Sequence, residues 1–222
     1  MAHSKKILLV EGEADKSFFE KMCKKLHLNA SVQVALPKDL GEHHNGKGAV
    51  FNRLTILLPQ LNDGQLTKIA IIVDADYSEH GSGKQKTLDQ VSNVLENIGF
   101  TLRDREPVQE GFLFKHSDGL EDFGLWIMPN NYSEGMLEDW IIQCINSDEK
   151  ALFGQADTAV QELPSPKFKP HLESKAKVAT WLAWQKTPGH GLYTAMKEGL
   201  LDEQSVPYKN LSDWLQKVFN EK

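Results

Sequence analysis

Acidic residues follow two apolar segments of the chain, at the points where each segment would leave a sheet. Glu11 comes directly after one run of branched apolar residues, and Asp74 and Asp76 follow another. Ligands of an open parallel sheet collect at the carboxyl ends of its strands, so these side chains should converge there. Asp15 lies in the first turn of the helix expected after Glu11. Gathered carboxylates repel one another, and hard divalent cations such as Mg²⁺ or Mn²⁺ bind such oxygen ligands.

A simpler explanation exists for two of these acids. Acidic residues favour the first turn of a helix because of the helix dipole, and this accounts for Asp15 about as well as metal binding does. Asp76 could be a turn residue. Glu11 and Asp74 together favour a site, because two separate strands both end in an acid.

Two glutamates lie farther along the chain, in a segment expected to form a helix. Glu134 and Glu138 are four residues apart and would share a helix face. The preceding strand should end at Met128, which places the start of this helix at the same edge of the sheet. Glu138 interrupts an apolar stripe and should therefore lie near the sheet rather than in open water, although a solvated helix flank explains it equally well.

The segment Gly46-Lys47-Gly48 ends a polar, glycine-rich loop predicted over residues 37–48. Glycines let the backbone approach a phosphate, and a helix N-terminus offers amide donors. The spacing lacks the longer spacer and the Ser or Thr of a phosphate-binding loop, so a flexible turn is the alternative. The preceding His43 and His44 show no metal-binding spacing.

One basic stretch lies in this acidic chain. Residues 164–190 contain five lysines and a single acid, Glu173. Such a stretch could contact phosphates, and one lysine could neutralise charge that develops on a phosphoryl oxygen. A solvated helix face is the alternative for most of them. The lysines are Lys167, Lys169, Lys175, Lys177 and Lys186.

The hydrophobic pattern predicts an α/β fold with a mostly parallel sheet and helices on both faces. Strands are expected at 5–10, 31–36, 68–73 and 124–128, with an irregular hairpin around 112–114. Helices are expected at 14–26, 51–61, 85–98 and 133–145, and then at 151–163, 174–185, 192–200 and 211–219. This order divides the chain into an α/β core over 1–150 and a helical C-terminal part over 151–222.

Composition sets further bounds. The chain has 222 residues, 40% of them hydrophobic, and a net charge of −6, which argues against a broad basic surface for nucleic acid. No apolar run approaches the length of a membrane span, and the N-terminal run is too short for a signal peptide. Cys23 and Cys144 lie among apolar residues and are expected to be buried thiols in a cytoplasmic protein.

The motifs together resemble the Toprim (topoisomerase–primase) family. Its pattern is Glu-Gly after the first strand, a glycine after the second and Asp-x-Asp after the third. The corresponding residues are Glu11-Gly12, Gly46 or Gly48, and Asp74-Ala75-Asp76. The segments Leu137–Trp140 and Lys175–Lys177 are similar to those of the overcoming-lysogenization-defect nuclease branch. Trp181–Gln185 and Pro188-Gly189 resemble small stand-alone bacterial Toprim proteins of unassigned function.

This resemblance implies a nuclease that uses two ions of Mg²⁺ or Mn²⁺, roughly 3.5–4 Å apart, to cleave DNA or RNA. Asp74 and Asp76 would bind metal, and Glu11 would be a ligand or a general acid–base. Asp15 and Glu138 would complete a second metal site. Either Lys175 or Lys177 would face the scissile phosphate. Nucleases of this branch usually carry an ATPase domain, so the resemblance leaves two alternatives for this chain: activity that needs a partner ATPase, or weak activity alone.

Other functions fit less well. A Toprim protein that binds metal or nucleic acid without cutting is the main alternative. A phosphoacceptor receiver domain would need two adjacent acids where Gly12 separates Glu11 from Glu13, and a lysine where Pro129 begins a polar turn. In a dinucleotide-binding dehydrogenase, a glycine would stand in place of Glu11.

Overall fold

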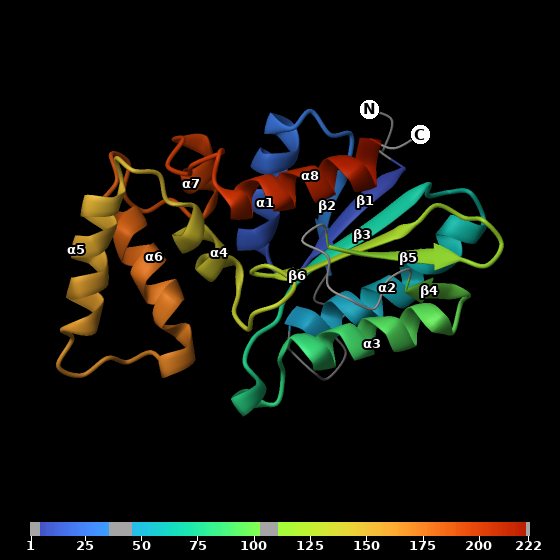
Figure 1. Ribbon diagram of the computed structural model, residues 1–222, viewed down its shortest axis with the longest axis horizontal. Coiled ribbons are helices and arrows are strands. Elements are labelled where there is room, and N and C mark those ends of the chain that lie inside the picture. The colour runs from blue at the N-terminus through green and yellow to red at the C-terminus, as the bar shows by residue number, and fades with distance from the viewer. Residues whose placement is uncertain (1–4, 36–45, 103–110, 221–222) are drawn as a thin grey trace.

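A mixed sheet forms the centre of the computed structural model, which describes residues 5–35, 46–102 and 111–220 (Figure 1). Within these ranges the sheet has six strands in the order β2-β1-β3-β6-β5-β4. Four strands run parallel: β2 (Ser31–Val34), β1 (Lys6–Val10), β3 (Lys68–Asp74) and β6 (Phe123–Met128). The edge formed by β5 (Phe112–His116) and β4 (Phe100–Leu102) is antiparallel. The predicted mostly parallel α/β fold is confirmed.

Helices cover both faces of the sheet. Figure 1 shows α1 (Glu13–Lys25) and α8 (Val206–Asn220) on one face, with α2 (Gly46–Asn62) and α3 (Lys84–Glu96) on the other. Residues of β1 alternate between the two apolar cores that result. Leu8 belongs to the core under α1 and α8, and Leu9 to the core under α2 and α3. A continuous apolar run is expected for a strand that is buried on both faces.

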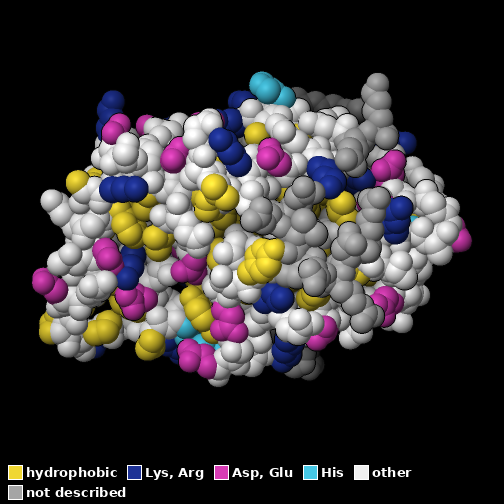
Figure 2. Space-filling view, viewed as in Figure 1, with side chains coloured by type: hydrophobic (Ala, Val, Ile, Leu, Met, Phe, Trp, Pro, Cys, Tyr) yellow, Lys and Arg dark blue, Asp and Glu magenta, His cyan; other side chains and the backbone are white. Residues whose placement is uncertain are grey.

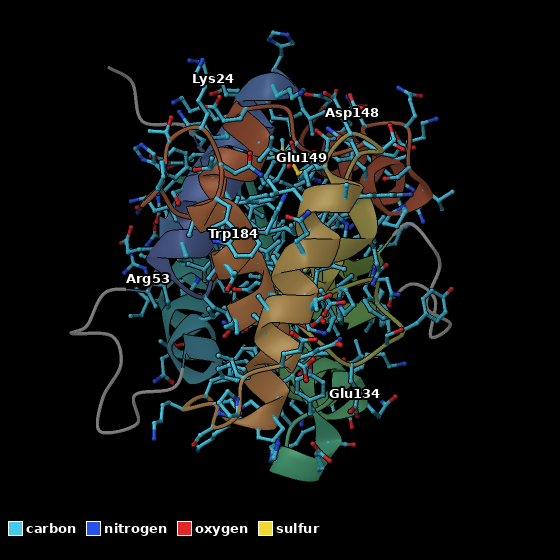
Figure 3. All side chains as sticks on the ribbon, turned by 90° about the vertical axis from the view of Figure 1, so that its left-hand side faces the viewer. Lys24, Arg53, Glu134, Asp148, Glu149 and Trp184 are labelled. Carbon is cyan, nitrogen blue, oxygen red and sulfur yellow. The ribbon has the colours of Figure 1, made fainter. Side chains whose placement is uncertain are left out.

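The C-terminal helices continue from the carboxyl edge of β6. They are α4 (Leu137–Cys144), α5 (Lys150–Gln161), α6 (Glu173–Ala183) and the short α7 (Tyr193–Lys197). The helices α5 and α6 form a hairpin at the left of Figure 1, and α5 stands in front of α6 in Figure 3. Oε2 of Glu149 holds α6 by accepting hydrogen bonds from Trp181 Nε1 at 2.9 Å and Gln185 Nε2 at 2.7 Å. The helix α8 then returns to the sheet, where Trp214 packs against Trp126 with ring centroids 5.5 Å apart.

Three predicted boundaries are wrong. The helix predicted from residue 133 begins at Leu137, because Oδ1 of Asn130 accepts the amides of Tyr132 and Ser133 in a turn. Residues 46–48 belong to the first turn of α2 rather than to the loop, whose earlier part lies outside the described residues. The last helix begins at Val206 instead of residue 211, because a proline such as Pro207 is tolerated in a first turn.

The remaining elements agree with the pattern more closely. The sequence predicts an irregular hairpin around 112–114. The structure has the strand β5 there, and β5 pairs antiparallel with both β4 and β6. Cys23 and Cys144 are buried free thiols, as expected. No helix within the described ranges is long and apolar enough to span a bilayer. On the face shown in Figure 2, basic side chains lie interspersed with acidic ones rather than in one broad patch.

Candidate functional site

The side chain of Glu11 lies against the end of the neighbouring strand. Because β1 and β3 are adjacent and parallel, both end at the same edge of the sheet. There, Oε1 of Glu11 accepts a hydrogen bond from the backbone amide of Asp74 at 2.8 Å. The predicted convergence of the two strand-end acids is confirmed.

Asp74 connects this pair to the start of α4. Its Oδ1 accepts a hydrogen bond from the amide of Leu137 at 3.0 Å, and the positive end of the helix dipole favours a carboxylate there. Burial raises the pKa of Asp74 well above its ordinary value, and the charges of Glu11, Asp15 and Glu138 raise it further. This carboxyl is therefore surrounded by acids.

Asp15 has a structural role in the same place. Its Oδ2 accepts a hydrogen bond from the amide of Gly12 at 2.9 Å, so it fixes the entry to α1. This hydrogen bond caps the helix and agrees with the structural explanation of an acid in a first turn, while metal binding by Asp15 stays a prediction. Burial nevertheless raises the pKa of Asp15, while Lys175 and the Gly12 amide lower it. Asp15 therefore contributes negative charge to the site as well as a cap.

Glu138 completes a group of four acids, which we call the acid cluster. Its side chain lies on α4 and is only 7% exposed, and Oε1 is 3.7 Å from Lys175 Nζ. Burial raises the pKa of Glu138, and Lys175 opposes that rise. The acid cluster consists of Glu11, Asp15, Asp74 and Glu138.

Lys175 is the lysine of α6 that joins the acid cluster. Burial lowers its pKa, but attraction to all four acids outweighs burial and raises the pKa above the ordinary value. Lys177 instead pairs with Asp157 at 2.7 Å and Glu173 at 2.6 Å. Of the two lysines that the sequence left open, only Lys175 interacts with the acid cluster.

The pKa of Glu11 lies near neutral pH. Burial raises its pKa to about 7, with repulsion from Asp76 and Asp15 adding to burial, while the Asp74 amide and Lys47 oppose it. Gly46 packs directly against this carboxylate. A Cβ on Gly46 would lie 2.9 Å from Oε2 of Glu11, so any larger residue at this position would push the carboxylate from its place.

The predicted phosphate-binding segment lies beside Glu11, at the start of α2. Gly46, Lys47 and Gly48 line a cavity of about 430 Å³ together with Glu11, Asp76 and Lys86. Lys47 is only 8% exposed and pairs with Asp76, Nζ to Oδ2, at 2.8 Å. Phosphate binding by this segment stays a prediction.

The acid cluster offers hard oxygen donors, the ligands that Mg²⁺ and Mn²⁺ prefer. Glu11, Asp15 and Asp74 each give one oxygen to a backbone amide, which fixes the direction of the carboxylate. Among the described residues, no three acidic, histidine or cysteine side chains form a ready-made metal-binding group. The donor chemistry fits such an ion, and metal binding remains to be tested.

Two contacts near the acid cluster escaped the sequence reasoning. Oδ2 of Asp139 accepts the amide of Met136 at 2.8 Å, and Oδ1 accepts a hydrogen bond from Ser174 Oγ. The predicted start of α4 at residue 133 hid the first contact, because Asp139 lies in the first turn only when the helix begins at Leu137. Nothing local indicates the second contact. Glu134 lies before the start of α4, near Gly83 at the start of α3, and is labelled low in Figure 3. Because Glu134 is outside the helix, the prediction that it shares a helix face with Glu138 is wrong.

A family model described as "Protein of unknown function (DUF3226)" matches residues 5–220. The chain belongs to this family. The DUF3226 match includes the whole sheet, the acid cluster and the α5–α6 hairpin. No curated protein and no solved structure matched the chain. For this DUF3226 protein, function must therefore be argued from the site itself.

Proposed function

We propose that this protein is a metal-dependent nuclease of the Toprim type that cleaves phosphodiester bonds in DNA or RNA with Mg²⁺ or Mn²⁺. The observation that supports this proposal is the acid cluster with Lys175 beside it. Four acids from β1, α1, β3 and α4 meet one lysine from α6 at the carboxyl edge of a parallel sheet. Ligands of such sheets bind at this edge.

The order of the motifs along the fold also supports a Toprim-type protein. Glu11-Gly12 follows β1, Gly46 opens the helix after β2, and Asp74-Ala75-Asp76 ends β3. Gly46 makes room for Glu11, which gives the family glycine a physical reason in this chain. The same resemblance extends the proposal to a partner ATPase.

The protein residues would act as follows. Glu11 would act as a general acid–base while the other three acids hold the ion, because its pKa of about 7 in the metal-free protein lets it hold or release a proton at neutral pH. Lys175 stays protonated and can neutralise charge that develops on a phosphoryl oxygen. The other three acids would hold the divalent ion, which supplies Lewis-acid stabilisation and a lowered pKa for bound water.

The decisive experiment incubates the purified protein with supercoiled plasmid and with single-stranded RNA, with and without Mg²⁺ or Mn²⁺. We expect metal-dependent nicking or cleavage that is lost in Glu11→Gln and in Asp74→Asn. Glu13→Gln is the matched control, because Glu13 lies two residues from Glu11 but its side chain is 76% exposed. Its activity should equal that of the wild type.

Other results would redirect the proposal. Equal background activity in the wild type and both variants, with retained nucleic-acid binding, would favour a Toprim protein that binds without cutting. Activity that appears only with a protein recovered by pull-down would support the partner ATPase.

A further inference from the structure

Asp76, the second acid of the Asp74-Ala75-Asp76 motif, already pairs with a lysine of the same chain. Oδ2 of Asp76 accepts a hydrogen bond from Lys47 Nζ at 2.8 Å. The Lys47 side chain comes from the first turn of α2 and is almost completely buried. The expected pair of metal-binding aspartates is therefore divided between two environments.

The ammonium group of Lys47 has four oxygen neighbours. Besides Asp76, it donates to Ser82 Oγ at 2.9 Å, Thr87 Oγ1 at 3.1 Å and the Ala75 carbonyl at 3.2 Å. Carboxylate, carbonyl and hydroxyl oxygens are also the ligands of hard metal ions. We call these four oxygens the Lys47 cage.

The backbone holds the Lys47 cage in place. Asp76 has φ +56°, a left-handed conformation that is costly for a residue with a side chain. Its amide donates to the Gly135 carbonyl at 2.9 Å and its carbonyl accepts from the Gly135 amide at 3.1 Å. The Gly83 amide donates to the Ala75 carbonyl at 2.9 Å. The direction of the Asp76 side chain is thus imposed by the turn after β3.

Moving Lys47 out of its cage would be costly. A buried ammonium group that loses its carboxylate leaves an uncompensated charge away from water. A metal ion bound through the same Asp76 oxygen would have to displace this ammonium group. The side chain of Asp76 is 44% exposed and lines the cavity beside Glu11, while its Oδ2 pairs with Lys47.

We propose that Lys47 occupies the position of a second metal ion, so that the protein binds one divalent cation in the acid cluster and none at Asp76. This inference rests on the metal site of the proposed function and changes the number of ions in it. Lys47 is then a positioning residue. Its side chain holds a positive charge beside Glu11 that, unlike a bound metal ion, cannot leave the protein. Its charge lowers the proton affinity of Glu11 against the effect of burial.

The test counts bound Mn²⁺ ions per chain by electron paramagnetic resonance of the free ion during a titration. We expect one ion in the wild type. Lys47→Ala should bind two, because the Asp76 carboxylate and the other oxygens of the Lys47 cage become available. Two ions in the wild type, or one ion in Lys47→Ala, would overturn the inference and leave the proposed nuclease standing. No ion in the wild type would remove the metal site on which both proposals rest.

A matched control is available on the same strand as Asp74. Lys68 opens β3, is 5% exposed and pairs with Glu121 at 3.0 Å, at the opposite end of the strand from Asp74. Lys68→Ala removes a comparable buried ion pair and should still bind one ion. A second ion in this variant would show that any lost lysine creates metal binding, which would overturn the role of the cage.

A second variant keeps the test decisive if Lys47→Ala does not fold, as judged by circular dichroism. Asp76→Asn retains Lys47 and an oxygen at the same position, and should bind one Mn²⁺ ion as the wild type does. A loss of that ion in Asp76→Asn would make Asp76 a metal ligand and would refute the inference.

Discussion

Ser174 and Asp139 join α6 to α4 at the point where each helix contributes a charge to the site. Ser174 Oγ donates to Oδ1 of Asp139, one residue before Lys175 and one residue after Glu138. The same aspartate accepts the Met136 amide at the start of α4. This contact therefore fixes the distance between the lysine of the site and its nearest acid.

Ser174→Ala should lower the cleavage rate without removing any charged group. We expect a smaller loss than in Lys175→Met, and a stability loss of about 1 kcal/mol for one hydrogen bond. Rates and urea unfolding would be compared with Ser17→Ala, whose hydroxyl donates to the Ala14 carbonyl in its own helix. Equal rates in Ser174→Ala and the wild type would show that this contact does not position Lys175.

Lys175→Met and Lys177→Met should behave differently although the two lysines are only two residues apart. Lys175→Met should abolish cleavage, because it removes the only lysine whose pKa responds to all four acids among those the structure describes. Lys177→Met should keep cleavage and lose some stability, because it breaks the pairs with Asp157 and Glu173. Plasmid-nicking rates and thermal melting of both variants check this, and the reverse pattern would assign the role to Lys177.

Gly46→Ala should disturb the site while the fold persists. The added Cβ would approach Oε2 of Glu11 to 2.9 Å and push the carboxylate away from the Asp74 amide. We expect weaker Mn²⁺ binding and slower cleavage, measured by calorimetry and nicking. Gly154→Ala is the control, because no atom lies within 4 Å of its Cβ, and this change in a helix should be neutral or stabilise by up to about 1 kcal/mol. Unchanged metal binding in Gly46→Ala would contradict the steric argument.

The stability of the metal-free protein should fall as the pH rises from about 5 to about 8. The pKa of Glu11 is about 7 in the folded protein against 4.5 as its ordinary value, so the folded state binds the proton more tightly. This stabilisation is fully present below pH 4.5 and is lost as the pH passes through 7. The raised pKa values of Asp15, Asp74 and Glu138 act in the same direction.

Glu11→Gln isolates the part of this pH dependence that belongs to Glu11. Urea unfolding at a series of pH values should show a shallower decline in the variant than in the wild type. Parallel curves would mean that Glu11 titrates near its ordinary pKa. Saturating Mg²⁺ should also flatten the wild-type curve, because the ion favours the ionised carboxylates.

Much of the fold was predictable because the strands that carry the site have strong local signals. The continuous apolar runs of β1, β3 and β6 belong to strands buried on both faces, and turn residues follow each of them. The positions of Glu11 and Asp74 follow from this pattern and from parallel pairing. Asp15 and Glu138 follow from the helices that begin at the same edge.

The remaining parts of the site depend on contacts between distant segments. Lys47 and Asp76 are 29 residues apart, and a lysine between two glycines gives no local sign of burial. The choice between Lys175 and Lys177 depends on which face of α6 packs against α4, because residues two apart on a helix point in different directions. The true start of α4 depends on the side chain of Asn130, which competes with the helix for its own neighbouring amides.

The position of α8 has a consequence for how the protein folds. This helix covers the sheet face beside α1, and its Trp214 packs against Trp126 with the two rings tilted by 52°. The two tryptophans lie far apart in the chain, so closing the loop between them costs entropy before their contact stabilises the fold. Until α8 docks, that part of the sheet face stays open to solvent.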